Sequence, residues 1–254
     1  MNELLTSYKN SITGLLDQLL CTQQEAIEQA AGVLCAAILE DRRIHLLGAG
    51  AHSQLAVEEV LWRAGGLAAW NPILDPGTSL VHGAKRSVSF ERLPGYGVGV
   101  LNANRVGETP GETLILVDAY GISPLSLDLA LECRKRGVYT IGVTSPAYGL
   151  ATPEDSPLRH PSRKNLFGEV DLVINSGVPL GDAVGRVPGF AQPVGSSSTF
   201  CSCMALELLV LATVQKLVEA GAEPPVFMSA NLPEGDAANA RWEAKYAPRA
   251  RCLL

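Results

Sequence analysis

One segment constrains the fold of this chain more than any other, residues 112–137, which read ETLILVDAYGISPLSLDLALECRKRG. An apolar run over 113–117 ends at a turn that contains a glycine, and an amphipathic helix pattern begins directly after that turn. A helix that starts just behind a buried strand points its free backbone N–H groups and its positive dipole end at one place beyond the strand. Anionic small molecules bind at such places, so this segment predicts a small-molecule site.

A second strand–glycine–helix unit lies upstream at 43–66, and two such corners in one sheet can converge on one ligand. The apolar runs predict strands at 43–47, 67–70, 113–117, 138–143 and 171–174. Helical spacing predicts two helices within 4–40 and single helices at 53–64, 123–136, 198–220 and 236–246. This alternation is typical of an α/β fold with a doubly wound parallel sheet, whose ligands bind beyond the carboxyl ends of the strands.

Proline and glycine define the remaining stretches. Residues 71–77 and the proline-rich stretch 150–163 are expected as loops, and within 79–106 only 97–101 is predicted as a strand. The chain is expected to divide into three parts: N-terminal helices for dimerisation or packing (1–40), the main domain (41–223), and a tail that packs on this domain or on a partner subunit (224–254).

Composition excludes several classes of protein. Hydrophobic residues make up 47% of the chain, enough for a substantial core, and the net charge of −6 argues against nucleic acid as a partner.

Cys201 and Cys203 fall inside an apolar helical pattern, so buried thiols are expected there rather than a metal site. No signal peptide opens the chain, and the uncharged run 30–39 is shorter than the ~20 residues of a membrane span. A cytoplasmic protein without membrane contact is predicted.

The first corner, GAGAHS at 48–53, offers glycines for close backbone approach and Ser53 as a hydroxyl donor. A dinucleotide fingerprint would need glycine at the sixth position and an acidic residue at the end of the next strand. Ser53 holds the sixth position, and the next strand is predicted to end at Trp70-Asn71. A dinucleotide is therefore disfavoured, and no cofactor is predicted. The alternative, that Ser53 only caps the helix, stays open.

At the second corner, DAYGIS at 118–123, Gly121 lets the backbone approach a ligand and Ser123 can cap the helix. Asp118 would repel a phosphate beside it, since two charges ~4 Å apart at an effective dielectric of ~20 repel by about 4 kcal/mol. The alternative is that Asp118 only ties down the turn.

Further candidates come from hydroxyl and titratable side chains. Ser197, Ser198 and Thr199 either cap the last long helix or add to the ligand site. His52 and His82 fall in loops at the carboxyl ends of predicted strands, and His160 falls in the proline-rich loop. The glutamates considered are Glu58, Glu59 and Glu91. Since Glu58 and Glu59 are adjacent on one helix, only one of them can face a site.

These corners and the text around them resemble the sugar isomerase (SIS) domain, more specifically stand-alone, phosphoheptose-isomerase-like bacterial SIS proteins. The matching stretches are HSQLAVEEVLWRAGGL, HGAKRSVSFERLPGYG, ISPLSLDLALECRKRGVYTIGVTS, RHPSRKNLFGEVDLVINSGVPLGDA and EAGAEPPVFMSANLPEGDAANARWEAKYAPR. The resemblance implies a five-stranded parallel α-β-α sandwich that works as a homodimer, with sites near the subunit interface.

The resemblance also implies site residues. SIS domains bind phosphosugars through a serine in the first corner, matched by Ser53, and through an S-x-S-G-x-T/S corner further on. In that second corner Gly121 and Ser123 match, whereas Asp118 and Tyr120 replace both serines.

SIS isomerases use a glutamate base and a histidine that opens the sugar ring. Glu59, His82 and His160 are the candidates here, with Glu59 first. The resemblance thus implies an isomerase that interconverts aldose and ketose, as free sugars or sugar phosphates, through a cis-enediol. The alternatives are a sugar sensor without catalysis, which the Asp118 and Tyr120 replacements favour, and an aminosugar lyase or etherase. No metal site is predicted, because the histidines and carboxylates are scattered.

Overall fold

The computed structural model describes residues 2–250 and 252 and contains a five-stranded parallel sheet, which confirms the expected fold class. The strands are β1 (Ile44–Gly48), β2 (Trp70–Ile73), β3 (Thr113–Val117), β4 (Tyr139–Thr144) and β5 (Leu172–Asn175). They lie in the order β2-β1-β3-β4-β5, so the chain moves to one side of β1 first and then returns to its other side. The sheet therefore has its topological switch point between β1 and β3, where open α/β sheets bind ligands.

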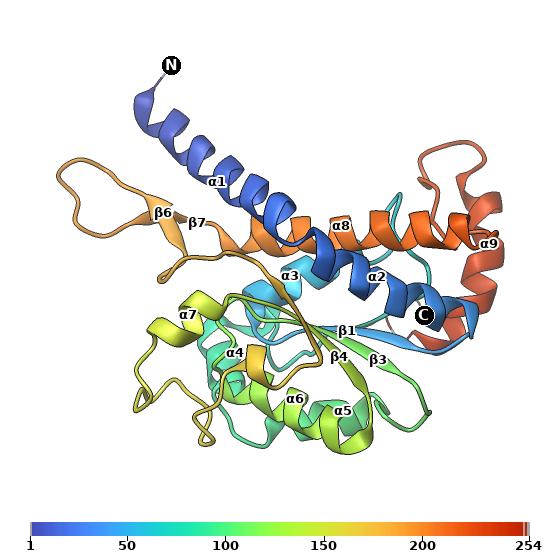
Figure 1. Ribbon diagram of the computed structural model, residues 1–254, viewed down its shortest axis with the longest axis horizontal. Coiled ribbons are helices and arrows are strands. Elements are labelled where there is room, and N and C mark those ends of the chain that lie inside the picture. Colours follow the sequence, from blue (N-terminus) through green and yellow to red (C-terminus); the bar gives the residue numbers. More distant parts are fainter. Residues whose placement is uncertain (1, 251, 253–254) are drawn as a thin grey trace.

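Helices cover both faces of the sheet (Figure 1). One face carries α2 (Gln24–Leu39), α3 (Ala51–Val60) and α8 (Ser198–Glu219), and the other carries α5 (Tyr96–Ala103) and α6 (Pro124–Arg136). Alternate residues of β3 enter the two cores: Ile115 and Val117 pack with the first set of helices, and Leu114 and Leu116 with the second. This period of two is what a strand buried on both faces requires.

The N-terminal helix α1 (Glu3–Thr22) projects beyond the sheet together with the hairpin of β6 (Ala183–Gly185) and β7 (Val194–Ser196) (Figure 1). The hydroxyl of Tyr8 donates to the backbone oxygen of Ser196 at 2.8 Å. The predicted pair of N-terminal helices is present, but the hairpin was not expected.

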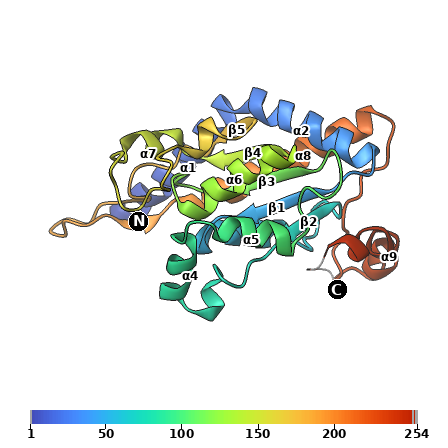
Figure 2. The same ribbon diagram turned by 90° about the horizontal axis from the view of Figure 1, so that it is seen from below.

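The C-terminal segment packs at the other end of the molecule, where α9 (Gly235–Tyr246) and the 3-10 turn η3 (Ala247–Arg249) lie (Figure 2). The N–H of Gly65 donates to Phe227 O at 2.8 Å, and Arg249 forms an ion pair with Asp41. These contacts join the C-terminal segment to the loops that precede β1 and β2.

The long helix α8 is apolar enough, by length and composition, to cross a membrane, and within the described residues it is the one helix of that kind. Half of its apolar window is buried inside the fold, where it packs against α2 and α3. Cys201 is fully buried and Cys203 is partly buried on this helix, and burial raises the pKa of both thiols to about 11.

Two sequence predictions misplace elements. Strand β2 begins at Trp70 rather than at residue 67, and it includes Asn71 and Pro72, which were expected in a loop. Proline has no N–H to donate, but β2 pairs only with β1, so the other edge of the strand needs no donor.

The strand predicted at 97–101 is wrong, because these residues belong to the helix α5. This short helix packs against α6, and a Cβ built on Gly97 would lie 2.7 Å from Asp128 Cβ, so glycine allows the close approach. A short apolar run with glycines does not distinguish a strand from a buried helix. The stretch 150–163 is mostly loop, as expected, although α7 (Pro146–Ala151) extends into its start.

The two glycines of α5 give a matched test of this packing. Gly97→Ala should lower the free energy of unfolding by about 1–3 kcal/mol, because the added methyl group overpacks the contact with α6. Gly99→Ala should raise it by about 0.5–1 kcal/mol, since nothing lies within 4 Å of its built Cβ and alanine favours a helix. Urea unfolding followed by circular dichroism measures both, and equal effects would contradict the close packing.

Candidate functional site

A cavity of about 140 Å³ lies at the switch point, beyond the carboxyl ends of β1 and β3. Four segments line it: residues 49–53 after β1, residues 118–120 after β3, the helix α4 (Ala84–Glu91) with Leu80 before it, and Ser198 at the start of α8. Both predicted corners therefore meet in one cavity. The connection between β2 and β3 closes it from a third side.

Glu91, the last residue of α4, is the titratable side chain that stands out in this cavity. Within the described residues, no hydrogen bond or ion pair holds its carboxylate. Burial raises the pKa of Glu91 to about 7, and the nearby negative charge of Asp118 adds to this rise, while Arg92 opposes it. A Cβ built on Gly50 would lie 2.8 Å from Glu91 Oε2, so the glycine before α3 makes room for the carboxylate.

Asp118 is 2% exposed and ties down the second corner. Its Oδ1 accepts the N–H of Tyr120 at 3.0 Å, and its Oδ2 accepts the hydroxyl of Ser123 at 3.4 Å. Burial raises the pKa of Asp118, although these hydrogen bonds favour the charged form. The corner therefore contains a fixed carboxylate, which also lines the cavity.

A third carboxylate, Asp182, occupies the start of α8. It accepts the N–H of Ser197 at 2.8 Å and the N–H of Ser198 at 2.6 Å, and it also accepts both serine hydroxyls, at 3.0 and 2.8 Å. The serine hydroxyls predicted to cap α8 do not do so, because they donate to Asp182, and Asp182 accepts the N–H groups in their place. Two of the free N–H groups at the start of α8 are therefore used by a protein carboxylate.

Of the residues predicted from the sequence, the structure brings five to the cavity: His52, Ser53, Asp118, Tyr120 and Ser198. Ser53 does not cap α3, because the helix begins at Ala51 and Gly50 is its N-cap. The ring of Tyr120 stacks on that of Tyr148, with 4.3 Å between the ring centroids.

The other predicted ligand-binding residues lie behind the cavity wall or beside it. Gly121 packs against β4, since a Cβ built there would lie 2.5 Å from Thr144 Oγ1. Ser123 is buried and caps α6 through Ser126, as the sequence predicts. Ser197 is fully buried on Asp182, and Thr199 follows in the first turn of α8 outside the lining.

The three predicted catalytic residues do not line the cavity. Glu59 forms an ion pair with Arg63 at 3.0 Å on a partly exposed side of α3. His82 is an exposed residue at the end of the 3-10 turn η1 (Leu80–His82), between two lining residues.

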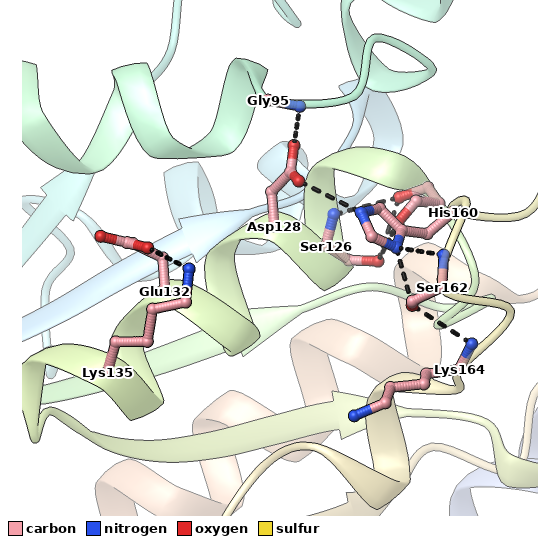
Figure 3. Close-up of polar contacts among 9 residues, drawn as sticks. Gly95, Ser126, Asp128, Glu132, Lys135, His160, Ser162 and Lys164 are labelled. Atoms are coloured by element: carbon pink, nitrogen blue, oxygen red, sulfur yellow. Dashed lines mark hydrogen bonds and ion pairs between the residues drawn. The ribbon is translucent and has the colours of Figure 1, made fainter.

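His160 belongs to a separate polar cluster, shown in Figure 3. Its Nε2 lies 3.2 Å from Asp128 Oδ1, and its Nδ1 lies 2.7 Å from Ser162 Oγ. Asp128 also accepts the N–H of Gly95 at 2.6 Å, in the turn that follows α4. His160 therefore helps to hold the segment that carries Glu91.

Glu91 and Ser87 are the polar lining residues of α4, and the predicted site includes neither. The sequence analysis considers Glu91 as a titratable residue, but it does not place Glu91 in the site because no strand–helix corner marks its position. Ser87 is fully buried and donates to Thr78 O at 2.6 Å, which fixes α4 against the loop after β2. Among the described residues, no group of three or more His, Cys, Asp or Glu side chains is arranged to hold a metal ion.

The partly buried carboxylate of Glu91 should cost stability at high pH. Its pKa is about 7 in the folded protein against 4.5 in the unfolded chain, a difference that corresponds to roughly 3 kcal/mol. The folded protein keeps this proton longer, so the free energy of unfolding falls as pH rises from 4.5 to 7 and stays low above that range. Glu91→Gln should therefore raise Tm by about 5–10 °C at pH 8 and leave it nearly unchanged at pH 4.

Differential scanning calorimetry at both pH values measures this effect. Glu154→Gln, which removes an exposed loop carboxylate, controls for the loss of one negative charge. A gain from Glu91→Gln of the same size at pH 4 and pH 8 would contradict the raised pKa.

Comparison of the sequence with known proteins identifies a family model and close relatives. The family model described as "SIS domain" matches residues 7–145, which is more than half of the chain. A UPF0309 protein of Shouchella clausii is 35% identical over 233 residues, which cover 91% of this chain and 92% of that protein. A UPF0309 protein of Geobacillus kaustophilus is 31% identical over 251 residues, covering 99% of this chain and 97% of that protein.

Solved structures show the same fold at low sequence identity. The phosphoheptose isomerase of Neisseria gonorrhoeae superposes with a TM-score of 0.55 at 12% identity, covering 85% of this chain and 98% of that one. The sugar isomerase domain of an RpiR transcription factor from Sphaerobacter thermophilus superposes with a TM-score of 0.50 at 18% identity, covering 86% and 93%.

Proposed function

This chain belongs to the SIS domain family, and on that premise we propose that its cavity binds a sugar and that Glu91 transfers a proton between adjacent sugar carbons. The proposed reaction is the exchange of an aldose and a ketose through a cis-enediol. One observation carries the proposal: an unpaired carboxylate with a pKa of about 7 lies in the cavity at the switch point of the sheet. A general base works best when its pKa is near the working pH.

In the proposed chemistry Glu91 moves the carbon-bound proton, and solvent water balances the two oxygens. The carboxylate takes the C2 proton of an open-chain aldose, the C2 electron pair forms the C1=C2 bond, and the C1=O1 electron pair moves to O1, which takes a proton from water. Glu91 then returns its proton to C1, and the hydroxide left by that water takes the O2 proton, which yields the ketose. The first N–H groups of α3, which begins beside the cavity, can stabilise the negative charge that develops on the sugar oxygens.

His52 is the histidine that lines this cavity, so we assign ring opening to it rather than to His82 or His160. Glu91 likewise replaces Glu59 as the proposed base. Ser53 and Ser198 supply hydroxyl oxygens that can bind the hydroxyl groups of a sugar.

Exchange of the C2 proton with solvent tests this function. The purified protein is incubated in D2O with aldoses and their 6-phosphates, and NMR follows the incorporation of deuterium. Glu91→Gln should lower the exchange rate by about 10²–10⁴-fold, because it removes the base. For the wild type the rate should rise with pH through about 7, the pKa of Glu91.

Glu59→Gln is the matched variant for this experiment. Loss of exchange in Glu59→Gln with normal exchange in Glu91→Gln would restore Glu59 as the base. Binding of a sugar without any exchange would instead favour the sensor, and release of a fragment would favour a lyase.

We further propose that the protein acts in the cytoplasm as a homodimer with the cavity near the subunit interface. Helix α8 leaves apolar side chains exposed along its outer side, with Phe200 at 49%, Leu211 at 65% and Val218 at 60% exposure. Leu55 on α3, the helix that packs against α8, is also exposed, at 38%. Ser198 lines the cavity, and Phe200 lies in the same first turn of α8. An interface that includes Phe200 would therefore adjoin the site.

Leu211→Lys tests the dimer, because a buried unpaired charge opposes association. Sedimentation velocity should show a dimer for the wild type and a monomer for the variant. Leu150→Lys, at a leucine of α7 that is 72% exposed and lies outside the apolar surface of α8, is the control and should stay dimeric. A monomeric wild type, or a dimeric Leu211→Lys, would contradict this interface.

A further inference from the structure

We propose that Asp128 is a positioning residue for the reaction assigned to Glu91, and that His160 fixes Asp128 in this role. The inference rests on the proposed function and extends it to side chains outside the cavity. Asp128 lies on α6, His160 lies in the loop that follows α7, and neither lines the cavity. Figure 3 shows the contacts that join both residues to the turn after α4.

The helix α4, which ends at Glu91, depends on contacts from outside to stay in place. It has eight residues, all of them described, and Ser87 is the one whose side chain is buried. A helix of this length is not stable alone in water, where about 12–15 residues are needed. Ser87 anchors the middle of α4 through its bond to Thr78 O. The end that carries Glu91 needs a second anchor.

The turn that follows Glu91 provides this second anchor. Four residues after Glu91, the N–H of Gly95 donates to Asp128 Oδ2 at 2.6 Å. The next residue, Tyr96, packs its ring on that of Phe90, with 4.7 Å between the ring centroids. Phe90 directly precedes Glu91 in the sequence. Asp128 therefore fixes the turn to α6, and the turn in turn fixes the end of α4.

His160 holds the other oxygen of Asp128. The N–H of Ser162 donates to His160 Nδ1 at 3.0 Å, so Nδ1 is an acceptor and the neutral ring carries its proton on Nε2. This Nε2 lies 3.2 Å from Asp128 Oδ1 and donates to it. Hydrogen bonds to a charged carboxylate are stronger than neutral ones, so two of them hold a side chain that is only 8% exposed firmly in place.

The backbone of this loop is joined to the second corner of the site. The N–H of His160 donates to Ile122 O at 2.9 Å, and Leu166, which follows the loop, donates its N–H to Gly121 O at 2.8 Å. The corner after β3 and the turn after α4 are therefore held to one loop. Loss of the ring contact would let Glu91 move relative to the corner, and a displacement of about 1 Å can lower a rate by 10²-fold.

Substitutions at the two residues test this role. His160→Gln keeps a donor that can reach Asp128, whereas His160→Asn keeps only an acceptor for Ser162 and is too short to reach Asp128. Asp128→Asn keeps one acceptor, which can serve either Gly95 or His160 but not both. Glu132→Gln is the control, because Glu132 is another carboxylate of α6, and the partners of its two ion pairs, at 3.0 and 3.1 Å, lie on the same helix.

NMR titration of the Glu91 carboxyl carbon, assigned by comparison with Glu91→Gln, measures its surroundings without any substrate. Burial raises the pKa of Glu91 to about 7 in the wild type. In His160→Asn and Asp128→Asn a displaced carboxylate should be better solvated, so its pKa should fall to about 6 or lower. His160→Gln and Glu132→Gln should leave it unchanged. The groups near Glu91 that titrate or carry charge are the same in every variant: His52, Arg92, Asp118 and Tyr120.

C2 proton exchange is the second measurement. In His160→Asn and Asp128→Asn the maximal exchange rate should fall by about tenfold or more at an unchanged KM, because the base is displaced while the corners that bind the sugar remain. His160→Gln should recover most of the wild-type rate, and Glu132→Gln should keep it.

The outcomes separate this inference from the proposed function. An unchanged Glu91 pKa in both His160→Asn and Asp128→Asn would overturn the inference, whether or not the protein exchanges protons. An equal fall in all four variants would also overturn it, because it would indicate general loosening of the fold. A fall confined to the first two variants supports the positioning of Glu91. If the wild type then exchanges no C2 proton of any sugar, the isomerase is overturned and the positioning stands. Should Asp128→Asn not fold, the two His160 variants decide.

Discussion

Helices α3 and α8 begin at the cavity with the positive ends of their dipoles, and α6 begins directly after the corner that lines it. Such an arrangement attracts negative charge, and here much of that charge comes from the protein itself. Asp182 binds the start of α8, Asp118 ties down the corner before α6, and Glu91 lies beside the N-cap of α3. The geometry of the site follows from where these carboxylates lie.

Of the three carboxylates, Glu91 alone lacks a hydrogen-bond partner within the described residues. Asp118 and Asp182 accept bonds from backbone N–H groups and hydroxyls, which fix their positions. Glu91 is partly buried and close to the charge of Asp118, and both effects raise its pKa to about 7. A group held this way costs stability, and natural proteins keep such groups mainly where chemistry needs them.

The sequence predicts the scaffold well because the scaffold depends on local patterns. The strand Thr113–Val117 and the cap at Ser123 lie where the apolar run and the Ser-Pro pair indicate. The site is predicted only in part. His52, Ser53 and Asp118 follow directly from the two corners, but Glu91 reaches the cavity through tertiary contacts: Ser87 holds α4 to Thr78, and Asp128 holds the turn at Gly95. No periodicity in the sequence encodes those contacts.

The corners follow from local sequence patterns, whereas Glu91 is placed by tertiary contacts. This difference explains how proteins with one fold can carry out different chemistry. The corners after β1 and β3 depend on backbone geometry, and they bring polar groups to the switch point in any sheet of this order. The proposed base instead comes from α4, in the connection between β2 and β3, which has no role in the pairing of the strands. A change in that connection can replace the acid–base group while the corners stay in place. Resemblance of the corners alone therefore identifies the location of the site, and the residue that reacts has to be found from the three-dimensional contacts of the connection.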